Sequence, residues 1–174
     1  VVIPMFNEAE NIGPVVREIL AVLPEDAVFE VIIVDDASTD ATAELGLALH
    51  DEDSRIRLLR HRNNAGQSAA IRNGAKWAMH DWVVTMDGDG QNDPADIPKL
   101  FEAMSGRAET PPLGLVGGLR AKRQDTLARR WVSTSANAIR QAVLKDNCRD
   151  TGCSLKAIRR ELLVDLPNFK GLHR

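Results

Sequence analysis

The sequence has few of the residues that mark disulfide-rich, zinc-binding or membrane-spanning proteins. It contains no tyrosine and only two cysteines, Cys148 and Cys153, and aromatic residues make up 4% of its 174 positions. Two thiols without the spacing of a zinc site are better explained as inert side chains in a reducing compartment than as a disulfide framework. No apolar stretch approaches the roughly 18–20 residues that span a bilayer, and no signal-peptide pattern is present. These absences favour a cytoplasmic protein.

The remaining composition predicts one folded domain. Hydrophobic residues make up 44% of the chain and charged residues 27%, a balance that is typical of globular proteins with a single core. The chain begins at Val1 inside an apolar run, and it stops after residues 171–174 without a helix end or a tail-like composition. We therefore interpret residues 1–174 as a single domain cut at both ends.

Charge is divided unevenly along the chain. Residues 1–119 hold 9 Lys and Arg against 20 Asp and Glu, a net charge of −11, whereas residues 120–174 hold 13 against 5, a net charge of +8. The basic last third predicts an anionic partner, although solvated helix faces explain most single basic residues. Nucleic acid is disfavoured, because the basic residues lack interleaved aromatics and the acidic remainder would repel a polyanion. A compact phosphate group fits better.

Apolar runs and helical patterns alternate along the chain. Strands are expected over residues 1–3, 29–34, 56–59, 82–86 and 113–116, and helices over residues 12–23, 41–49, 66–79 and 94–104. Strands buried on both faces read as unbroken apolar runs, so we predict an α/β domain whose mainly parallel sheet has helices on both faces. Such sheets bind ligands beyond the carboxyl ends of their strands. The polar clusters after the first, second and fourth strands should therefore meet at one site.

The strongest candidate site is the segment DGDGQ at residues 87–91, directly after the fourth expected strand. On an extended segment, Asp87 and Asp89 project to the same side about 6–7 Å apart, which suits a divalent ion held by one carboxylate directly and by the other through water. Mg²⁺ binds through one or two carboxylates together with substrate phosphates, and Mn²⁺ accepts similar ligands. A calcium loop is disfavoured, because Asn92 and Pro98 stand where its glycine and glutamate belong. An acidic surface turn without a ligand is the remaining alternative.

Two further polar clusters follow the first and second expected strands. In the cluster at residues 34–40, Asp36 can accept a hydrogen bond from a nucleobase or a ribose hydroxyl, whereas Asp40 is better suited to cap the next helix. The cluster at residues 4–8 lies beside it if the first two strands are neighbours. Its Phe6 can stack on a base or pack as a hydrophobic staple on the following helix, and the sequence favours neither.

Arginines of the last third are candidate phosphate ligands. Arg120 follows two glycines that would let its guanidinium reach the site, and Arg129 and Arg130 open an amphipathic helix. A planar guanidinium binds phosphate oxygens through two parallel hydrogen bonds. Other arginines are expected to face solvent: Arg123, Arg140, Arg159 and Arg160.

Together these segments resemble glycosyltransferase family 2, and within it the polyprenyl-phosphate glycosyltransferases, of which dolichol-phosphate mannosyltransferase is the best-known member. The resemblance is carried, in order, by residues 2–12, 34–40, 64–66, 87–94 and 150–153. It implies a GT-A fold, a nucleotide-sugar donor linked to GDP or UDP, and Mg²⁺ or Mn²⁺ held by the diphosphate and the D-x-D segment. Residues 1–119 would form the nucleotide-sugar and metal half, and residues 120–174 the basic acceptor side.

The resemblance also implies a role for particular residues. The nucleotide would be held by Pro4, Phe6, Glu8, Val34, Asp36 and Asp87, and the metal by Asp87, Asp89 and Gln91. Phosphate would meet Arg120, Arg129 and Ser133. The catalytic residues would be Asp89, Arg120 and Asp150. Because a phosphate acceptor is already largely ionised near pH 7, we expect Asp150 to orient groups more than to remove a proton.

The expected reaction is a single inverting transfer of a sugar to a polyprenyl-phosphate lipid, with peripheral contact at the inner face of the cytoplasmic membrane. Processive synthases of this family carry a Q-x-x-R-W motif, and here Leu127 stands at the glutamine position. Phe6 replaces the family's usual tyrosine and keeps a stacking face. Two alternatives stay open: transfer to a saccharide hydroxyl in cell-envelope glycan synthesis, and a nucleotide-sugar binding module without catalysis. A homo-oligomer is also left open.

Overall fold

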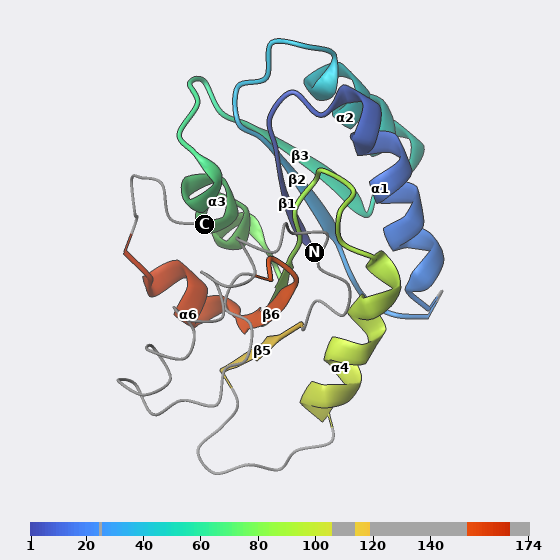
Figure 1. The fold of residues 1–174 in the computed structure, drawn as a ribbon, viewed down its shortest axis with the longest axis vertical. Coiled ribbons are helices and arrows are strands. Elements are labelled where there is room, and N and C mark those ends of the chain that lie inside the picture. Colours follow the sequence, from blue (N-terminus) through green and yellow to red (C-terminus); the bar gives the residue numbers. More distant parts are fainter. Residues whose placement is uncertain (25, 106–113, 119–152, 168–174) are drawn as a thin grey trace, which may run out of the picture.

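The structure is a computed structural model that describes residues 1–24, 26–105, 114–118 and 153–167. Within them lies one sheet in the order β3-β2-β1-β4-β6-β5 (Figure 1). Its strands are β1 (Val2–Met5), β2 (Val31–Asp35), β3 (Ile56–Arg60), β4 (Trp82–Thr85), β5 (Leu115–Gly117) and β6 (Lys156–Arg159). The four strands β1 to β4 pair in parallel, whereas β6 is antiparallel to both β4 and β5. The predicted mainly parallel sheet is confirmed.

Helices cover both faces of this sheet, as the unbroken apolar runs predict. They are α1 (Ala9–Val22), α2 (Thr42–Glu52), α3 (Gln67–Trp77), α4 (Ile97–Ser105) and α6 (Arg160–Asp165), with a 3₁₀ turn η1 (Pro94–Asp96) before α4. Helices α1, α2 and α4 share one buried cluster with the odd-numbered residues of β1 and β2, and α3 and α6 share another with the even-numbered ones. Because alternate side chains of each strand enter different cores, both sets must be apolar.

Strand β1 continues through Pro4, where the sequence predicted its end. The carbonyl of Val1 accepts from the N–H of Ile32 in β2, and that of Met5 accepts from the N–H of Asp36 just after β2. The backbone groups of the even positions of β1 therefore point toward β4. On that side the register holds only one pair, Val2 with Thr85. Pro4 has no N–H with which to extend this pairing, so the β1–β4 ladder is short, while the hydrogen bonds to the β2 side carry the strand as far as the site.

Neither strand β6 nor helix α6 was predicted, and their burial corrects the expectation that Arg159 and Arg160 face solvent. Arg159 was expected to face solvent, but it is half-buried and its guanidinium lies 4.6 Å from the ring centroid of Trp82. Arg160 is half-buried as well, at the first position of α6. The first and last residues of this short strand are basic, so its sequence is also typical of a solvent-exposed segment. It is identified as a strand only by its pairing with β4 and β5. Arg123 and Arg140 lie outside the described residues.

Close packing at Gly74 fixes α3 against the sheet. A Cβ atom at this position would lie 2.5 Å from Cγ1 of Val2 and 3.0 Å from Cγ2 of Val34, so no other residue fits without a shift. The helix thus holds its first residue, Gln67, near the carboxyl ends of the central strands. Among the described residues, no helix combines the length and apolarity needed to cross a bilayer.

Candidate functional site

The three polar clusters that follow β1, β2 and β4 meet at one open cavity of about 270 Å³. Six residues singled out from the sequence line it: Pro4, Phe6, Glu8, Asp36, Asp87 and Asp89. The loop before α3 contributes Asn64 and Gly66, from a segment that carries the family resemblance, and the first residue of α3 contributes Gln67. The sequence analysis assigned none of the three a role in the site. The convergence predicted from parallel strand ends is confirmed.

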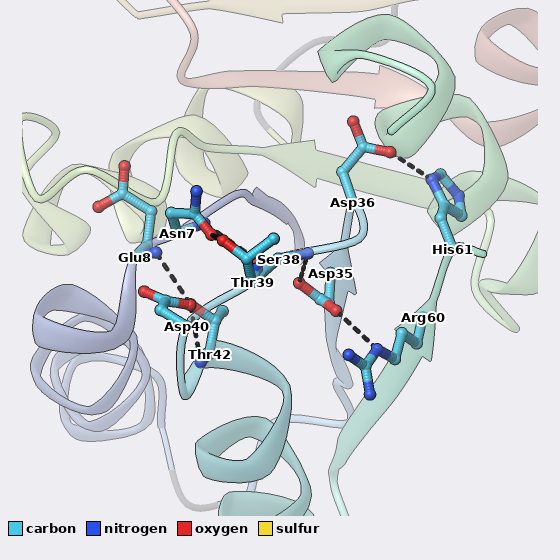
Figure 2. A network of polar contacts seen from close by, with 10 residues as sticks. All are labelled: Asn7, Glu8, Asp35, Asp36, Ser38, Thr39, Asp40, Thr42, Arg60 and His61. Carbon is cyan, nitrogen blue, oxygen red and sulfur yellow. Dashed lines mark hydrogen bonds and ion pairs between the residues drawn. The ribbon is translucent and has the colours of Figure 1, made fainter. Parts of the chain in front are cut away.

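Hydrogen bonds lock the loop after β1 to the loop after β2 (Figure 2). Asn7 has a positive φ of 57°. Its backbone N–H donates to Oγ of Ser38 over 2.9 Å, and its side-chain Oδ1 accepts from the backbone N–H of Thr39 over 2.8 Å. Because both loops lie at neighbouring strand ends, these contacts give the cavity one rigid wall.

Asp40 joins the N-termini of α1 and α2. Its Oδ1 accepts from the backbone N–H and hydroxyl of Thr42, and its Oδ2 accepts from the N–H of Ala9 over 3.1 Å. The hydroxyl oxygen of Thr42 in turn accepts from the N–H of Glu8 (Figure 2). These hydrogen bonds, that from the Thr42 hydroxyl foremost, hold the pKa of Asp40 below its ordinary value of 3.8. Asp40 is not itself the N-cap residue, because Ala41 precedes α2 and Glu8 precedes α1. Its carboxylate nevertheless binds the first backbone N–H of each helix, the kind of contact that the capping prediction anticipated for α2.

Asp35 and Asp36 are both buried, and they make different contacts (Figure 2). The carboxylate of Asp35 accepts from the N–H of Ser38 over 3.1 Å and lies 3.2 Å from Nε of Arg60. The carboxylate of Asp36 lines the cavity and is held by the chain itself, as its Oδ1 lies 2.6 Å from Nδ1 of His61.

Two backbone amides complete the contacts of Asp36. Its Oδ1 accepts from the N–H of Ala65 over 2.8 Å, and its Oδ2 accepts from the N–H of Gly66 over 2.7 Å. With His61, this makes three hydrogen-bond contacts on a carboxylate that has about four lone-pair positions. Asp36 therefore organises the loop before α3, whatever it also offers to a ligand.

Phe6 and Val34 differ sharply in exposure. The ring of Phe6 is 47% exposed at the cavity, which suits stacking on a flat ligand and not a staple packed on α1. Val34 is fully buried, and its side chain packs in the core beneath α3. A contact between Val34 and a nucleotide would therefore be limited to its backbone.

The D-x-D segment lies at the opposite wall of the cavity. Oδ1 of Asp87 accepts a hydrogen bond from Nε2 of Gln67, and Oδ1 of Asp89 accepts from the N–H of Gln91 over 3.1 Å. Asp87 is half-buried and Asp89 is exposed. The side chain of Gln91 is exposed and is not among the residues that line the cavity.

The two carboxylates at this wall suit a hard divalent cation whose remaining coordination positions are filled by water or phosphate. Within the part of the chain that the structure describes, no group of three or more His, Cys, Asp or Glu side chains could hold a metal. Asp87 and Asp89 instead offer two carboxylates beside open space. Mg²⁺ and Mn²⁺ accept such oxygen ligands, and Mg²⁺ keeps several positions for water and phosphate.

The segment that follows residue 152 lies against the D-x-D loop. Nδ2 of Asn92 donates to Oγ of Ser154 over 2.7 Å, and Oγ1 of Thr85 donates to the carbonyl of Ser154 over 2.8 Å. Cys153, next to Ser154, is buried and not in a disulfide. These contacts tie the start of the C-terminal segment to the candidate metal wall.

The chain matches the family described as Glycosyl transferase family 2 over residues 1–166. It belongs to glycosyltransferase family 2.

Relatives within family 2 act on polyprenyl phosphates, as their names state. The chain is 37% identical to an undecaprenyl-phosphate 4-deoxy-4-formamido-L-arabinose transferase of Pseudomonas aeruginosa, over 94% of this chain and 47% of the relative. It is 35% identical to a dodecaprenyl-phosphate galacturonate synthase of Rhizobium johnstonii, over 99% of this chain and 51% of the relative. The chain thus spans about half the length of these curated relatives.

A solved structure of a mannosyltransferase shares the fold. It is a mannosyltransferase from Pyrobaculum calidifontis in complex with GDP-Man and Mn²⁺, with a TM-score of 0.66 and 27% identity, and the match covers 92% of this chain and 44% of that one. The sheet with helices on both faces is the GT-A arrangement, so the predicted fold is confirmed.

Several residues predicted for the family 2 site lie outside the described residues: Arg120, Arg129, Ser133 and Asp150. Their roles stay predictions. The structure also identifies two residues that contact the site carboxylates and that the sequence analysis did not single out, Gln67 and His61. Each stands at or near an element boundary on the carboxyl-end side of the sheet, and that position was the signal that could have identified them.

Proposed function

We propose that this family 2 chain is the donor-binding and catalytic part of an inverting transferase. The enzyme would move a sugar from a GDP- or UDP-linked donor to a polyprenyl-phosphate lipid. One observation carries the proposal: the ring of Phe6 and the carboxylates of Asp36, Asp87 and Asp89 line one cavity. The names of the relatives support the acceptor class.

In the proposed donor site, the nucleoside contacts one wall of the cavity and the diphosphate contacts the other. Phe6 would stack on the base, and Pro4 and Glu8 would border the nucleoside beside Asp36. Asp87 and Asp89, with Gln91 as a further candidate ligand, would hold Mg²⁺ or Mn²⁺ on the diphosphate. A bound divalent ion offsets the charge that builds on the departing diphosphate. The hydrogen bonds between Gly66 and Asp36 and between Gln67 and Asp87 would keep the two walls at a fixed separation while the sugar is transferred.

On the acceptor side, the chemistry of a phosphate nucleophile sets what the protein must do. A phosphate monoester with a second pKa of about 6 is largely ionised near pH 7, so little proton abstraction remains. We propose that Arg120, Arg129 and Ser133 grip donor or acceptor phosphate. Asp150 would orient one of these groups or the attacking oxygen, and Asp89 and Arg120 would act at the reacting centre.

A lipid acceptor requires the site to work beside a bilayer. The net charge of +8 over residues 120–174 supports peripheral contact with anionic lipid at the inner face of the cytoplasmic membrane. Each Lys or Arg close to an anionic membrane surface contributes about 1 kcal/mol to the free energy of membrane binding, and salt screens this attraction.

The proposal is tested first by binding. Thermal unfolding of the full-length protein would be followed with UDP-glucose or GDP-mannose, each with and without MnCl₂. A donor at 100 times its Kd stabilises by about 2.7 kcal/mol, or roughly 5–11 °C for a domain of this size. Asp87→Asn with Asp89→Asn should abolish the metal-dependent part of this shift, since the carboxylates and the diphosphate hold the ion together.

A matched control removes two other carboxylates. Asp51→Asn with Glu52→Gln changes the net charge equally at exposed positions of α2, and it should keep the shift. An undiminished Mn²⁺-dependent shift in the Asp87 and Asp89 variant would sink the assignment of the metal wall.

Transfer is then measured to undecaprenyl phosphate in anionic or zwitterionic vesicles at low and high salt. Salt-sensitive preference for anionic vesicles supports membrane contact. Transfer only to a saccharide hydroxyl would overturn the proposed acceptor, and donor binding without transfer or hydrolysis would overturn the proposed catalysis.

The role of Asp150 is tested with Asp150→Asn. A loss of more than ~100-fold in transfer rate at every pH from 6 to 9 would contradict its orienting role and indicate a general base.

A further inference from the structure

Gln67 connects the loop before α3 to the candidate metal wall. It is the first residue of α3, it is half-buried, and it lines the same cavity as Asp87. Its side-chain Nε2 donates a hydrogen bond to Oδ1 of Asp87. A neutral amide restrains a carboxylate oxygen without neutralising its charge, whereas a lysine or arginine there would compete with a cation for it.

The backbone before Gln67 is held in a conformation that favours glycine. Gly66 has φ of 87° and ψ of 160°, a region that residues with a Cβ atom rarely adopt. Nothing lies within 4 Å of the position that its Cβ would take, so the backbone angles and not the space around it call for glycine. This bend directs the chain from the cavity into the first turn of α3.

Asp36 anchors this bend from the other side. Its two oxygens accept from the N–H groups of Ala65 and Gly66. His61 contacts the same carboxylate through Nδ1, and Nε2 of His61 lies 3.0 Å from the amide nitrogen of Asn73 on α3. The bend is therefore fixed both to the end of β2 and to the body of α3.

We propose that Gln67 is a positioning residue for the metal, and that the clamp formed by His61 and Asp36 fixes Gln67 in turn. The proposal rests on the proposed function above, because it assigns Asp87 to a divalent ion. One continuous set of contacts then runs from the nucleoside wall at Asp36 to the metal wall at Asp87. The ion would meet a carboxylate whose orientation is set before binding.

The expected size of the effect follows from other metal sites. Loss of a side chain that orients a ligand typically weakens metal affinity about 10–100-fold. Gln67→Leu keeps similar bulk and removes the donor, so it should raise the Kd for Mn²⁺ about tenfold or more. Binding of nucleotide without metal should stay within about twofold, because the bend at residues 65 and 66 is held by Asp36.

The experiment uses the full-length protein with UDP or GDP. Mn²⁺ binding is followed by the loss of the free-ion electron paramagnetic resonance signal, and nucleotide binding in EDTA by calorimetry. Ser68→Ala, an exposed neighbour on the same turn of α3, is the matched control and should bind Mn²⁺ like the wild type. Gln67→Asn retains an amide with a shorter reach, so it should fall between the wild type and Gln67→Leu.

The outcomes separate the inference from the proposed function. If the wild type shows no Mn²⁺-dependent nucleotide binding, the proposed function fails and the inference fails with it. If the wild type binds but Gln67→Leu holds Mn²⁺ within twofold of it, the positioning role alone is overturned. An equal loss of metal-free nucleotide binding in Gln67→Leu would also overturn it, since that result indicates a general structural role.

Discussion

Gly88, between the two aspartates of the D-x-D segment, lies so close to β1 that a methyl group should disturb both fold and site. A Cβ atom there would lie 2.2 Å from Sδ and 2.7 Å from Cε of Met5, and 3.1 Å from the carbonyl oxygen of Pro4. Ordinary contacts between heavy atoms are about 3.5–4.0 Å, so the overlap with sulfur is at least roughly 1.3 Å. Met5 is 1% exposed in the core and cannot swing into solvent.

The size of the effect follows from two opposing contributions. Overpacking a core typically costs about 1–3 kcal/mol, while Gly→Ala at a compatible backbone returns about 0.4–1 kcal/mol through the unfolded chain. Gly88 is not among the glycines of positive φ, so its backbone is compatible with alanine. We expect Gly88→Ala to lose roughly 1–2 kcal/mol, which lowers the Tm by roughly 2–8 °C. Mn²⁺-dependent nucleotide binding should weaken too, because Asp87 and Asp89 flank the displaced residue.

A double-mutant cycle tests the reasoning. Met5→Val removes Sδ and Cε and suits a β-strand, so it should relieve most of the clash with Ala at position 88. The sum of the destabilisations of the two single variants should then exceed the destabilisation of the double variant by about 1 kcal/mol, as measured by urea unfolding. Strict additivity, or a Gly88→Ala variant as stable as the wild type, would refute the packing argument.

Two further predictions concern the loop after β2. Ala37 has a φ of 62°, so Ala37→Gly should relieve about 1–2 kcal/mol of strain against about 0.4–1 kcal/mol of added unfolded-state entropy, a net gain of roughly 0.5–1 kcal/mol in urea unfolding. A less stable variant would contradict this. The pKa of Asp40 lies below 3.8 in the folded state, so its stabilising contribution is present above that pH and is lost as the pH falls through the folded value. The Tm of the wild type should exceed that of Asp40→Asn near pH 7, and the difference should shrink below about pH 4; a constant difference down to about pH 2.5 would count against the assignment.

The sequence determined the order of strands and helices as far as β5, and the place of the site. Period and turn chemistry are written in adjacent residues: the run at residues 31–34 is apolar throughout because it is buried on both faces. Parallel strand ends then had to bring the clusters of Asp36 and Asp87 together. The D-x-D segment and the contact of Asp40 with the start of α2 could be identified for the same reason, since each depends on residues next to a strand end.

Tertiary structure decided which side chains meet across elements. Strand β6 lies between β4 and β5 although about seventy residues separate it from β4 in the sequence, and its four residues, with a basic residue at each end, gave no local signal. The partners of Asp36 stand 25–30 residues along the chain at His61, Ala65 and Gly66, and Gln67 meets Asp87 across 20 residues. Local periodicity says which face of an element is buried, but a hydrogen bond between elements depends on how closely they pack. Here the close approach depends on Gly74, which lets α3 pack on Val2 and Val34, and on Gly88, which packs against Met5 of β1.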